Sequence, residues 1–297
     1  MVKVSVVVEG DKPFSALLEV AKTVDEYAFY SLQVYEHLPY RPAWGICFSV
    51  APFLRRVLVG PVTVPANLYS PHVNARFAAY LASVSPGAVL GISRGAYMGE
   101  RRATIKEVVE HVEQVVAHMA RMDWALGKPP VIYVGTSGPL LTRAAAKSSV
   151  VDGVVVDNLA NPIYAAMMRK WMDEAGGAGK ELVARPFTFL SEKQNEQRQF
   201  LNVLLRYVVD LVDGSPMMEY AGLRLEDLSD VDDEVAACVL DNFSIHGDVD
   251  DVVEKSVKLL KNGVNHLVFG HPIAANIVDG CRKIGEKVVP VLRDEFG

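Results

Sequence analysis

A glycine-bracketed turn, Gly135-Thr136-Ser137-Gly138, is the first stretch of this sequence that could bind a ligand. It follows a short β-branched run at residues 131–134 and precedes a segment with helical spacing of apolar residues. Two glycines allow successive backbone N–H groups to form a concave nest, and Ser137 can cap a helix whose N-terminus carries partial positive charge. Such a turn predicts a phosphate site. The alternative is a tight strand-to-helix turn with a serine cap.

Arg94, flanked by Ser93 and Gly95, is a second candidate for phosphate binding. A guanidinium group recognises phosphate through two parallel hydrogen bonds, and a neighbouring glycine lets a ligand approach the backbone closely. These properties favour phosphate binding over the alternative, in which Arg94 pairs with an acid across the rim of the fold.

His37 follows Glu36 directly after an apolar run at residues 30–35. Because histidine changes its protonation near neutral pH, a histidine at the end of a strand is a candidate for catalysis, and Glu36 could orient its ring. The alternative is a structural loop histidine beside a glutamate that faces solvent.

Polar residues follow the other apolar runs as well. They are Glu9, Thr63, Asp157, Asn158, Ser191 and His271. Together with the residues above they predict a ring of hydrogen-bonding groups around an otherwise apolar pocket. Histidines and carboxylates nowhere show the spacing of metal ligands, which predicts that no metal is bound. No serine lies in a nucleophile elbow, which disfavours acyl hydrolysis.

Eight short apolar runs alternate with segments of helical periodicity along the whole chain. The runs cover residues 4–8, 30–35, 56–64, 88–92, 131–134, 153–156, 182–190 and 266–269; the helical segments cover 14–24, 44–54, 70–84, 105–126, 139–145, 162–175, 194–212, 249–262 and 274–293. Continuous apolar strands are typical of a parallel sheet buried on both faces. Eight repeats favour a single closed (β/α)8 TIM barrel over two doubly wound halves, with the site at the C-terminal ends of the strands.

The chain shows no linker rich in Gly, Pro or Ser, and no GxGxxG follows the first run. We therefore expect one domain over residues 1–297. An acidic stretch at residues 219–241 has weak periodicity, and we expect it to be a solvated excursion with one short helix at 235–240.

A net charge of −6 and the lack of a basic cluster argue against nucleic-acid binding. Cys47, Cys238 and Cys281 lie far apart without CxxC spacing, as expected of reduced thiols in a cytoplasmic protein. The sequence has neither a secretory signal pattern nor an apolar run long enough to cross a membrane. We expect a cytoplasmic protein that acts on a small molecule.

Several motifs, in this order, resemble the luciferase-like flavin and deazaflavin oxidoreductases. Glu36-His37 is similar to the EH pair of bacterial luciferase, and GISRGAYMGE (residues 91–100) to its RGxY segment. VGPVTVPANLYSP (59–71) is similar to the third strand and the loop after it. IYVGTSGPLL (132–141), DGVVVDNLANP (152–162) and residues 243–273 resemble the deazaflavin-dependent methylenetetrahydromethanopterin reductases more closely. The resemblance covers residues 4–293.

The reductase branch departs from this sequence at three places. It has an acid where this sequence has Ala96, and another inside the first strand, where this sequence has valines at 6–8 and Glu9 about two positions later. In the third-strand loop it has a glycine at the position of Val62, beside a non-proline cis peptide bond.

The resemblance implies hydride transfer between coenzyme F420, a deazaflavin, or FMN as the alternative, and a small organic substrate. His37 would be the catalytic group and Glu36 its orienting partner, and the protein would be a homodimer. The implied cofactor-binding residues are Val62, Thr63, Ser93, Arg94, Gly95, Gly135, Thr136, Ser137 and Gly138. Two other functions stay open. One is a barrel that binds a flavin or deazaflavin without turnover, and the other is an unrelated phosphate-binding aldolase or isomerase, which the lack of a strand-end lysine disfavours.

Overall fold

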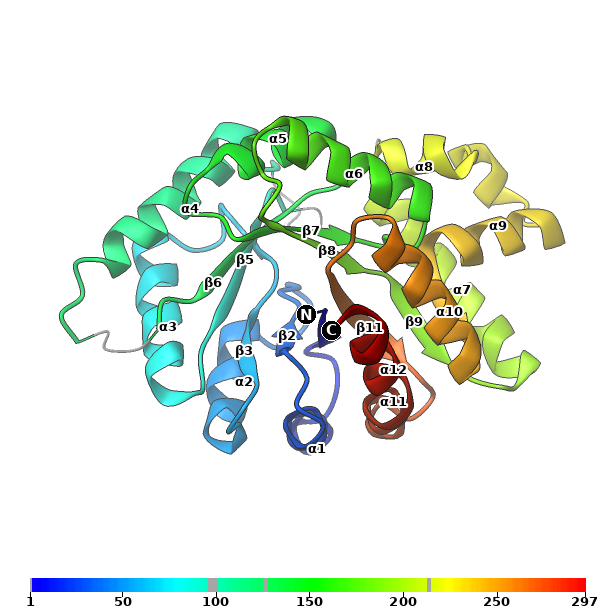
Figure 1. The fold of residues 1–297 in the computed structure, drawn as a ribbon, viewed down its shortest axis with the longest axis horizontal. Coiled ribbons are helices and arrows are strands. Elements are labelled where there is room, and N and C mark those ends of the chain that lie inside the picture. The colour runs from blue at the N-terminus through cyan, green and yellow to red at the C-terminus, as the bar shows by residue number, and fades with distance from the viewer. Residues whose placement is uncertain (1, 96–100, 125–127, 213–214) are drawn as a thin grey trace.

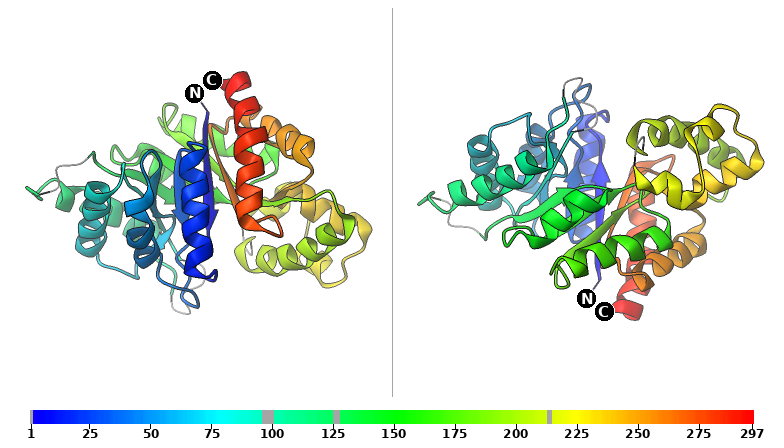
Figure 2. Two further views of the ribbon diagram at one scale, coloured as in Figure 1. Left: turned by 90° about the horizontal axis from the view of Figure 1, so that it is seen from below. Right: turned by 90° about the horizontal axis from the view of Figure 1, so that it is seen from above.

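The computed structural model describes residues 2–95, 101–124, 128–212 and 215–297. Its parallel strands curl into a nearly closed barrel with helices around the outside (Figure 1). The first strand and the last helix bring the two ends of the chain side by side (Figure 2). The predicted TIM-barrel architecture is therefore confirmed.

Each of the eight predicted strands is present. The described strands are β1 Lys3–Val8, β2 Ser31–Val34, β3 Leu58–Pro61, β4 Val64–Pro65, β5 Val89–Ser93, β6 Val131–Gly135, β7 Gly153–Asp157, β8 Glu181–Arg185, β9 Phe187–Leu190, β10 Ser244–Gly247 and β11 His266–Ile273. Their order around the barrel is β3-β2-β1-β11-β8-β7-β6-β5-β4, and a bridge between Val59 and Ala88 closes the ring. The third predicted strand is interrupted between β3 and β4, and the seventh at Pro186.

Strand β10 is absent from the sequence-based prediction. It pairs with β9 and lies off the path of the barrel strands. Its four residues, Ser-Ile-His-Gly, lack the apolar run by which the other strands are recognised.

The helices follow the strands as expected. They are α1 Phe14–Glu26, α2 Ala43–Val50, the 3-10 turn η1 Ala51–Phe53, α3 Pro71–Val84, α4 Ile105–Met119, α5 Pro139–Lys147, α6 Pro162–Glu174, α7 Gln194–Val212, α8 Pro216–Ala221, η2 Leu225–Ser229, α9 Asp233–Phe243, α10 Val249–Lys261, α11 Ile277–Lys283, the π-turn η3 Ile284–Val288 and α12 Val289–Phe296. Local signals set several of the starts: Ser70 caps α3 ahead of Pro71, and Asp248 caps α10.

Three predicted helices differ from the structure. The helix predicted at 105–126 ends at Met119, and Leu126 lies outside the described residues. The last predicted helix contains the π-turn η3 between α11 and α12. The acidic stretch holds the second half of α8, all of η2 and most of α9 instead of one short helix, because apolar residues in and beside it, such as Met218, Leu223 and Phe243, are buried in the hydrophobic core.

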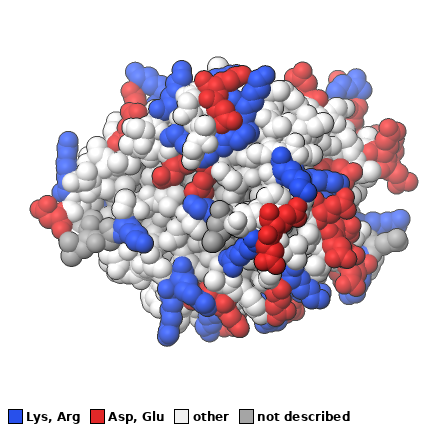
Figure 3. All heavy atoms as spheres, viewed as in Figure 1, with Lys and Arg blue, Asp and Glu red and all other residues white. Residues whose placement is uncertain are grey.

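The acidic side chains of this stretch remain on the outside. They gather with those of α10 on the face shown in Figure 3, and α7–α9 stand together at one side of the barrel (Figure 2). Among the described residues, none of the helices combines the length and apolarity that a membrane crossing requires.

The barrel interior has an apolar middle and a polar lower end. Seven residues fill the middle: Val7, Val62, Val89, Tyr133, Val155, Val183 and Val268. Below them, at the N-terminal ends of the strands, Glu181 accepts hydrogen bonds from Tyr133 (2.9 Å) and His266 (3.0 Å) and pairs with Lys3 (2.5 Å). This network occupies the lower end of the barrel, while the C-terminal strand ends surround a pocket.

Candidate active site

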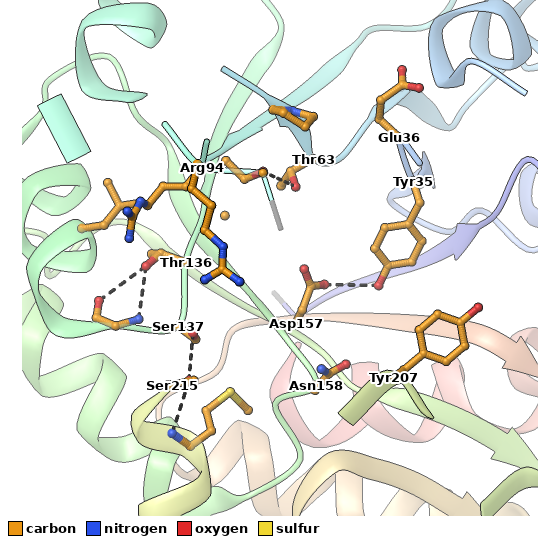
Figure 4. A pocket seen from close by; sticks show the side chains of 18 of the residues that line it. Tyr35, Glu36, Thr63, Arg94, Thr136, Ser137, Asp157, Asn158, Tyr207 and Ser215 are labelled. Carbon is orange, nitrogen blue, oxygen red and sulfur yellow. Dashed lines mark hydrogen bonds between the residues drawn. The ribbon is translucent and has the colours of Figure 1, made fainter. Parts of the chain in front are cut away.

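A pocket of about 430 Å³ lies at the C-terminal ends of the strands. The predicted site residues that line it are Glu36, His37, Thr63, Ser93, Arg94, Gly95, Gly135, Thr136, Ser137 and Gly138. Glu9, Asp157, Asn158 and His271, from the predicted ring, line it as well. Arg94 and the turn at 135–138 thus open onto the same cavity (Figure 4).

Arg94 is held at the pocket wall by its own loop. Its Nε donates to the carbonyl oxygen of Ala103 (2.7 Å), and the Ala103 N–H donates back to the Arg94 carbonyl oxygen (2.9 Å). Gly95 turns the chain with φ +78°, in the region that favours glycine. The structure records no hydrogen bond from the terminal Arg94 nitrogens to a described residue. Those nitrogens are therefore available to an anion. Residues 96–100, including the Ala96 position, lie outside the described residues.

The turn at 135–138 differs in detail from the prediction. The N-cap of α5 is Gly138, because the helix begins at Pro139, so Ser137 does not cap it. The Ser137 hydroxyl instead accepts a hydrogen bond from Ser215 (3.0 Å), and the Gly138 N–H donates to the Thr136 hydroxyl (3.2 Å). Pro139, Leu140 and Leu141 of the first turn of α5 line the pocket, so the positive end of the helix dipole lies beside it.

The floor of the pocket is the interruption between β3 and β4. The peptide bond between Val62 and Thr63 is cis, as the family resemblance implies, although this chain has valine where the reductases have glycine. The room comes from the neighbouring strand, because a Cβ atom at Gly91 would lie 2.7 Å from Val62 Cγ1. Val62 is fully buried and outside the lining, whereas Thr63 lines the pocket and donates to the Ser93 hydroxyl (3.0 Å).

A buried arginine fixes this floor. Arg185 is 1% exposed and donates from Nη1 to the Val62 carbonyl oxygen. Its Nε donates to Asp157 Oδ1 (2.5 Å), which also accepts from the Tyr35 hydroxyl (3.2 Å), as Figure 4 shows for Tyr35 and Asp157. The Arg185 guanidinium lies 4.2 Å from the centre of the Tyr35 ring. This network, which sequence reasoning missed, links β2, β7 and β8 to the cis peptide bond. The sequence did contain a signal for this network, because an arginine within an apolar strand is buried and a buried arginine requires a partner.

Glu9 lies against both pocket histidines. Its Oε1 is 3.6 Å from His37 Nδ1, and its Oε2 is 3.3 Å from His271 Nδ1. These are contacts at ion-pair distance without hydrogen-bond geometry, since neither Glu9 oxygen has a hydrogen-bond partner among the described residues. Glu9 is 2% exposed, and burial raises its pKa to about 7. Burial also lowers the pKa of His37, and that of His271 to about 3, so neutral imidazoles flank an acid that titrates near neutral pH.

Glu36 has another partner. Its Oε2 accepts a hydrogen bond from the Ala43 N–H (3.2 Å) at the start of α2, and in Figure 4 its carboxylate points away from Tyr35 and Asp157. Successive residues of an extended chain point to opposite sides, which separates Glu36 from its neighbours. The structure records the Glu9 carboxylate at ion-pair distance from His37.

The remaining wall is aromatic. Phe187, Tyr207 and His271 form a cluster with ring centroids 5.3 to 5.9 Å apart, and His37 stacks on Tyr35 at 5.3 Å. Ser191, predicted in the ring, does not line the pocket, because its hydroxyl donates to Glu196 (2.6 Å). The side chain of Asn161 caps α6.

No protein-family profile matches this chain. In sequence it is similar to the 5,10-methylenetetrahydromethanopterin reductase of Archaeoglobus fulgidus, with 25% identity over 95% of this chain and 97% of the relative. It is also similar to the F420-dependent glucose-6-phosphate dehydrogenase of Nakamurella multipartita, with 27% identity over 95% of this chain and 94% of the relative.

Solved structures show the same fold. The coenzyme F420-dependent tetrahydromethanopterin reductase from Methanopyrus kandleri matches with a TM-score of 0.80 and 18% identity, over 98% of this chain and 99% of that one. An F420-dependent secondary alcohol dehydrogenase matches with a TM-score of 0.78 and 17% identity, over 99% of both chains. The resemblance drawn from the sequence motifs is confirmed.

Proposed function

We propose that this chain, a relative of the F420-dependent oxidoreductases with their luciferase-like barrel, transfers hydride between coenzyme F420 and a small organic substrate. FMN is the alternative cofactor. The observation that carries the proposal is the convergence of three features on one pocket. These are the pocket floor at Thr63, the anion-binding groups at Arg94 and Gly135–Gly138, and the acid–histidine group of Glu9 and His37.

The residues present suit a phosphate-bearing ring cofactor. A pocket of about 430 Å³ falls in the range of small-molecule sites. The terminal nitrogens of Arg94 and the first amides of α5 would hold the phosphate, with Ser93, Gly95 and Thr136–Gly138 around it. The ring would rest on the bulge at Val62–Thr63. When bound, the cofactor supplies the hydride chemistry.

The chain itself supplies position and proton handling. Arg185, Asp157 and Tyr35 keep the floor in place. His37 would be the catalytic group that touches the reacting molecule, and Glu9 would hold or release a proton beside it. Phe187 and Tyr207 would exclude water from the reacting end. Glu36 would act indirectly, by anchoring the start of α2.

Visible absorption tests this proposal. Purified protein incubated with F420 or FMN and then freed of unbound cofactor should retain the deazaflavin band, which lies to the blue of the flavin band. Retention of the flavin band alone would assign FMN. Retention of neither would refute the proposal and favour an unrelated phosphate-binding barrel. Turnover of a substrate by the loaded protein then separates an enzyme from a cofactor-binding barrel without turnover.

Three further proposals concern the domain organisation, the cellular location and the oligomeric state. The whole chain would form one luciferase-like domain, since the barrel strands run from β1 to β11. Three free cysteines, with Cys47 and Cys281 buried, fit a cytoplasmic location. A homodimer would form through the aromatic face of α2, η1 and α3, where Phe53 and Tyr80 are about half exposed (48% and 50%).

A further inference from the structure

The pocket is charged differently at its two ends. We call one the arginine end, formed by Arg94, Arg102, the turn at 135–138 and Ser215, and the other the glutamate end, formed by Glu9, Tyr35, Glu36, His37, Phe187, Tyr207 and His271. Figure 4 shows Arg94, Ser137 and Ser215 on one side, Tyr35, Glu36 and Tyr207 on the other, and Asp157 between them. The two ends come from opposite sides of the barrel, since β5 and β6 carry the first, and β1, β2, β9 and β11 most of the second.

Among the described lining residues, the glutamate end contains neither lysine nor arginine. The stretches outside the description, 96–100, 125–127 and 213–214, contain none either. Both histidines of this end have a pKa lowered by burial and are neutral at pH 7. An anion bound here would therefore meet no cation.

Two positive charges that lie beyond the lining are paired with carboxylates. Arg185 does not line the pocket, and its Nε and Nη1 bind Asp157 and the Val62 carbonyl oxygen, while Nη2 is buried without a hydrogen-bond partner among the described residues. Lys12, beyond the lining, pairs with Asp11 at 2.5 Å. Both cations carry a neutralising carboxylate.

Glu9 sets the polarity of this end. Both of its oxygens, and Nε2 of His271, are buried without a hydrogen-bond partner among the described residues. An unsatisfied buried carboxyl group is costly, and a donor on the substrate would remove that cost. A phosphate or carboxylate on the substrate would instead place like charges together where the dielectric constant is low. The aromatic rings of Phe187 and Tyr207 suit a planar or cationic group.

We infer that the substrate bound at the glutamate end is an uncharged or cationic molecule that presents a hydrogen-bond donor to Glu9, and that substrates with an anionic group at this end are rejected. The inference rests on the proposed function, because the cofactor is taken to occupy the arginine end. If the inference holds, this chain differs in substrate class from an enzyme that binds a sugar phosphate at the glutamate end.

Three planar probes of matched shape test the inference: benzamide (uncharged), benzamidine (cationic) and benzoate (anionic). Each is titrated into the cofactor-loaded protein at low ionic strength, and binding is followed by the absorption of the bound cofactor and by calorimetry. Loading covers the arginine end, so benzoate cannot bind there. Benzamide and benzamidine should bind at least about tenfold more tightly than benzoate.

A variant pair locates the effect. Glu9→Gln should reduce the preference for benzamidine over benzoate several-fold, whereas Glu19→Gln, which removes an exposed carboxylate of α1, should leave it unchanged. The inference is overturned if benzoate binds the wild-type protein as tightly as the other probes, if none of the three binds, or if both variants behave alike. Failure to load either cofactor is a distinct result, which overturns the proposed function together with the inference.

Discussion

Burial determines what the charged side chains of this pocket can do. Glu9 is a carboxyl group in a place where water cannot solvate its charge, and its two histidine neighbours are neutral for the same reason. Arg185 is also buried but stays charged, because Asp157 is bound to it. Arg185, which is paired with Asp157, keeps its charge and helps to hold the structure together. Glu9, which accepts no hydrogen bond from a described residue, can gain or lose a proton near neutral pH.

The pH dependence of stability follows from the Glu9 pKa. Folding raises this pKa from 4.5 to about 7, so the folded state binds the proton more tightly than the unfolded state does. The contribution of Glu9 to stability should therefore fall as pH rises from about 4.5 to 7 and then level off, while His271, whose pKa is lowered by folding, contributes in the opposite direction. Glu9→Gln lacks this titration, so its stability relative to wild type should rise over that range by up to about 3 kcal/mol.

Urea unfolding at pH 4.5, 6 and 8 measures this difference. Glu19→Gln serves as the control and should follow wild type, because its carboxylate is exposed. A difference between Glu9→Gln and wild type that does not change with pH would contradict the assigned pKa.

Arg94 is expected to contribute cofactor affinity. Arg94→Ala should weaken cofactor binding by about 1.5–3 kcal/mol, the scale of a hydrogen bond to a charged group. Arg94→Lys should recover part of the loss, since it keeps the charge but not the forked geometry. Titration followed by cofactor absorption gives the affinities. Arg282→Ala, an exposed residue of α11 paired with Asp279, is the control. Unchanged affinity in Arg94→Ala would remove this residue from the site.

At the scale of elements, the pocket depends on how closely β4, β5 and β6 approach one another. Thr63, between β3 and β4, lies close to the neighbouring strands, which have Gly91 and Gly135 at the points of contact. A Cβ atom at Gly135 would lie 2.6 Å from Thr63 Cγ2 and 3.2 Å from Ser93 Cβ, whereas nothing lies within 4 Å of one at Gly138. Gly135 is therefore required by its close contact with Thr63, whereas no such contact requires a glycine at position 138.

This difference predicts opposite outcomes for two alanine substitutions. Gly135→Ala should destabilise the protein by about 1–3 kcal/mol, the usual cost of overpacking. Gly138→Ala should change stability by less than about 1 kcal/mol, because the site has room and its φ of −108° suits any residue. Urea unfolding of the two variants side by side makes the comparison, and equal losses would show that the close contact at Gly135 is not limiting.

At the scale of the whole molecule, aromatic residues gather on the face formed by α2, η1 and α3, where the proposed homodimer would form. Trp44 and Phe48 of α2 contact Phe77 of α3, Phe48 also contacts Tyr80, and Phe53 and Tyr80 remain about half exposed. Helix α3 begins after the pocket floor, so an interface on this face would also support the strands that shape the site.

The proposed homodimer gives a direct prediction. The wild-type protein should sediment at twice the mass of one chain, and Tyr80→Lys should shift it toward the monomer, because a lysine would be buried without a partner. Val291→Lys, an equally conspicuous apolar residue on α12 with 42% exposure, should leave the dimer intact. Analytical ultracentrifugation decides between these states. A monomeric wild-type protein, or equal behaviour of the two variants, would reject this interface.

The sequence alone was sufficient for the barrel and for the strand ends that line the pocket. Apolar runs and helical spacing are local, so the eight barrel strands, most helices and the strand-end positions of His37, Arg94 and Gly135–Gly138 could be predicted from them. Elements without a clear local pattern could not be predicted in this way. Strand β10 is short and partly polar, and α8 and α9 are stabilised by packing against the barrel.

Only the tertiary structure decided which side chains are partners. Glu9 lies just after β1, His37 just after β2 and His271 on β11. They meet because closure of the barrel places these strands next to one another. The same closure brings Arg185 under the cis bond between Val62 and Thr63. Partner choice and burial depend on contacts between residues far apart in the chain, and burial in turn sets the protonation of the site. Local sequence patterns therefore predict neither the partners of these side chains nor their burial.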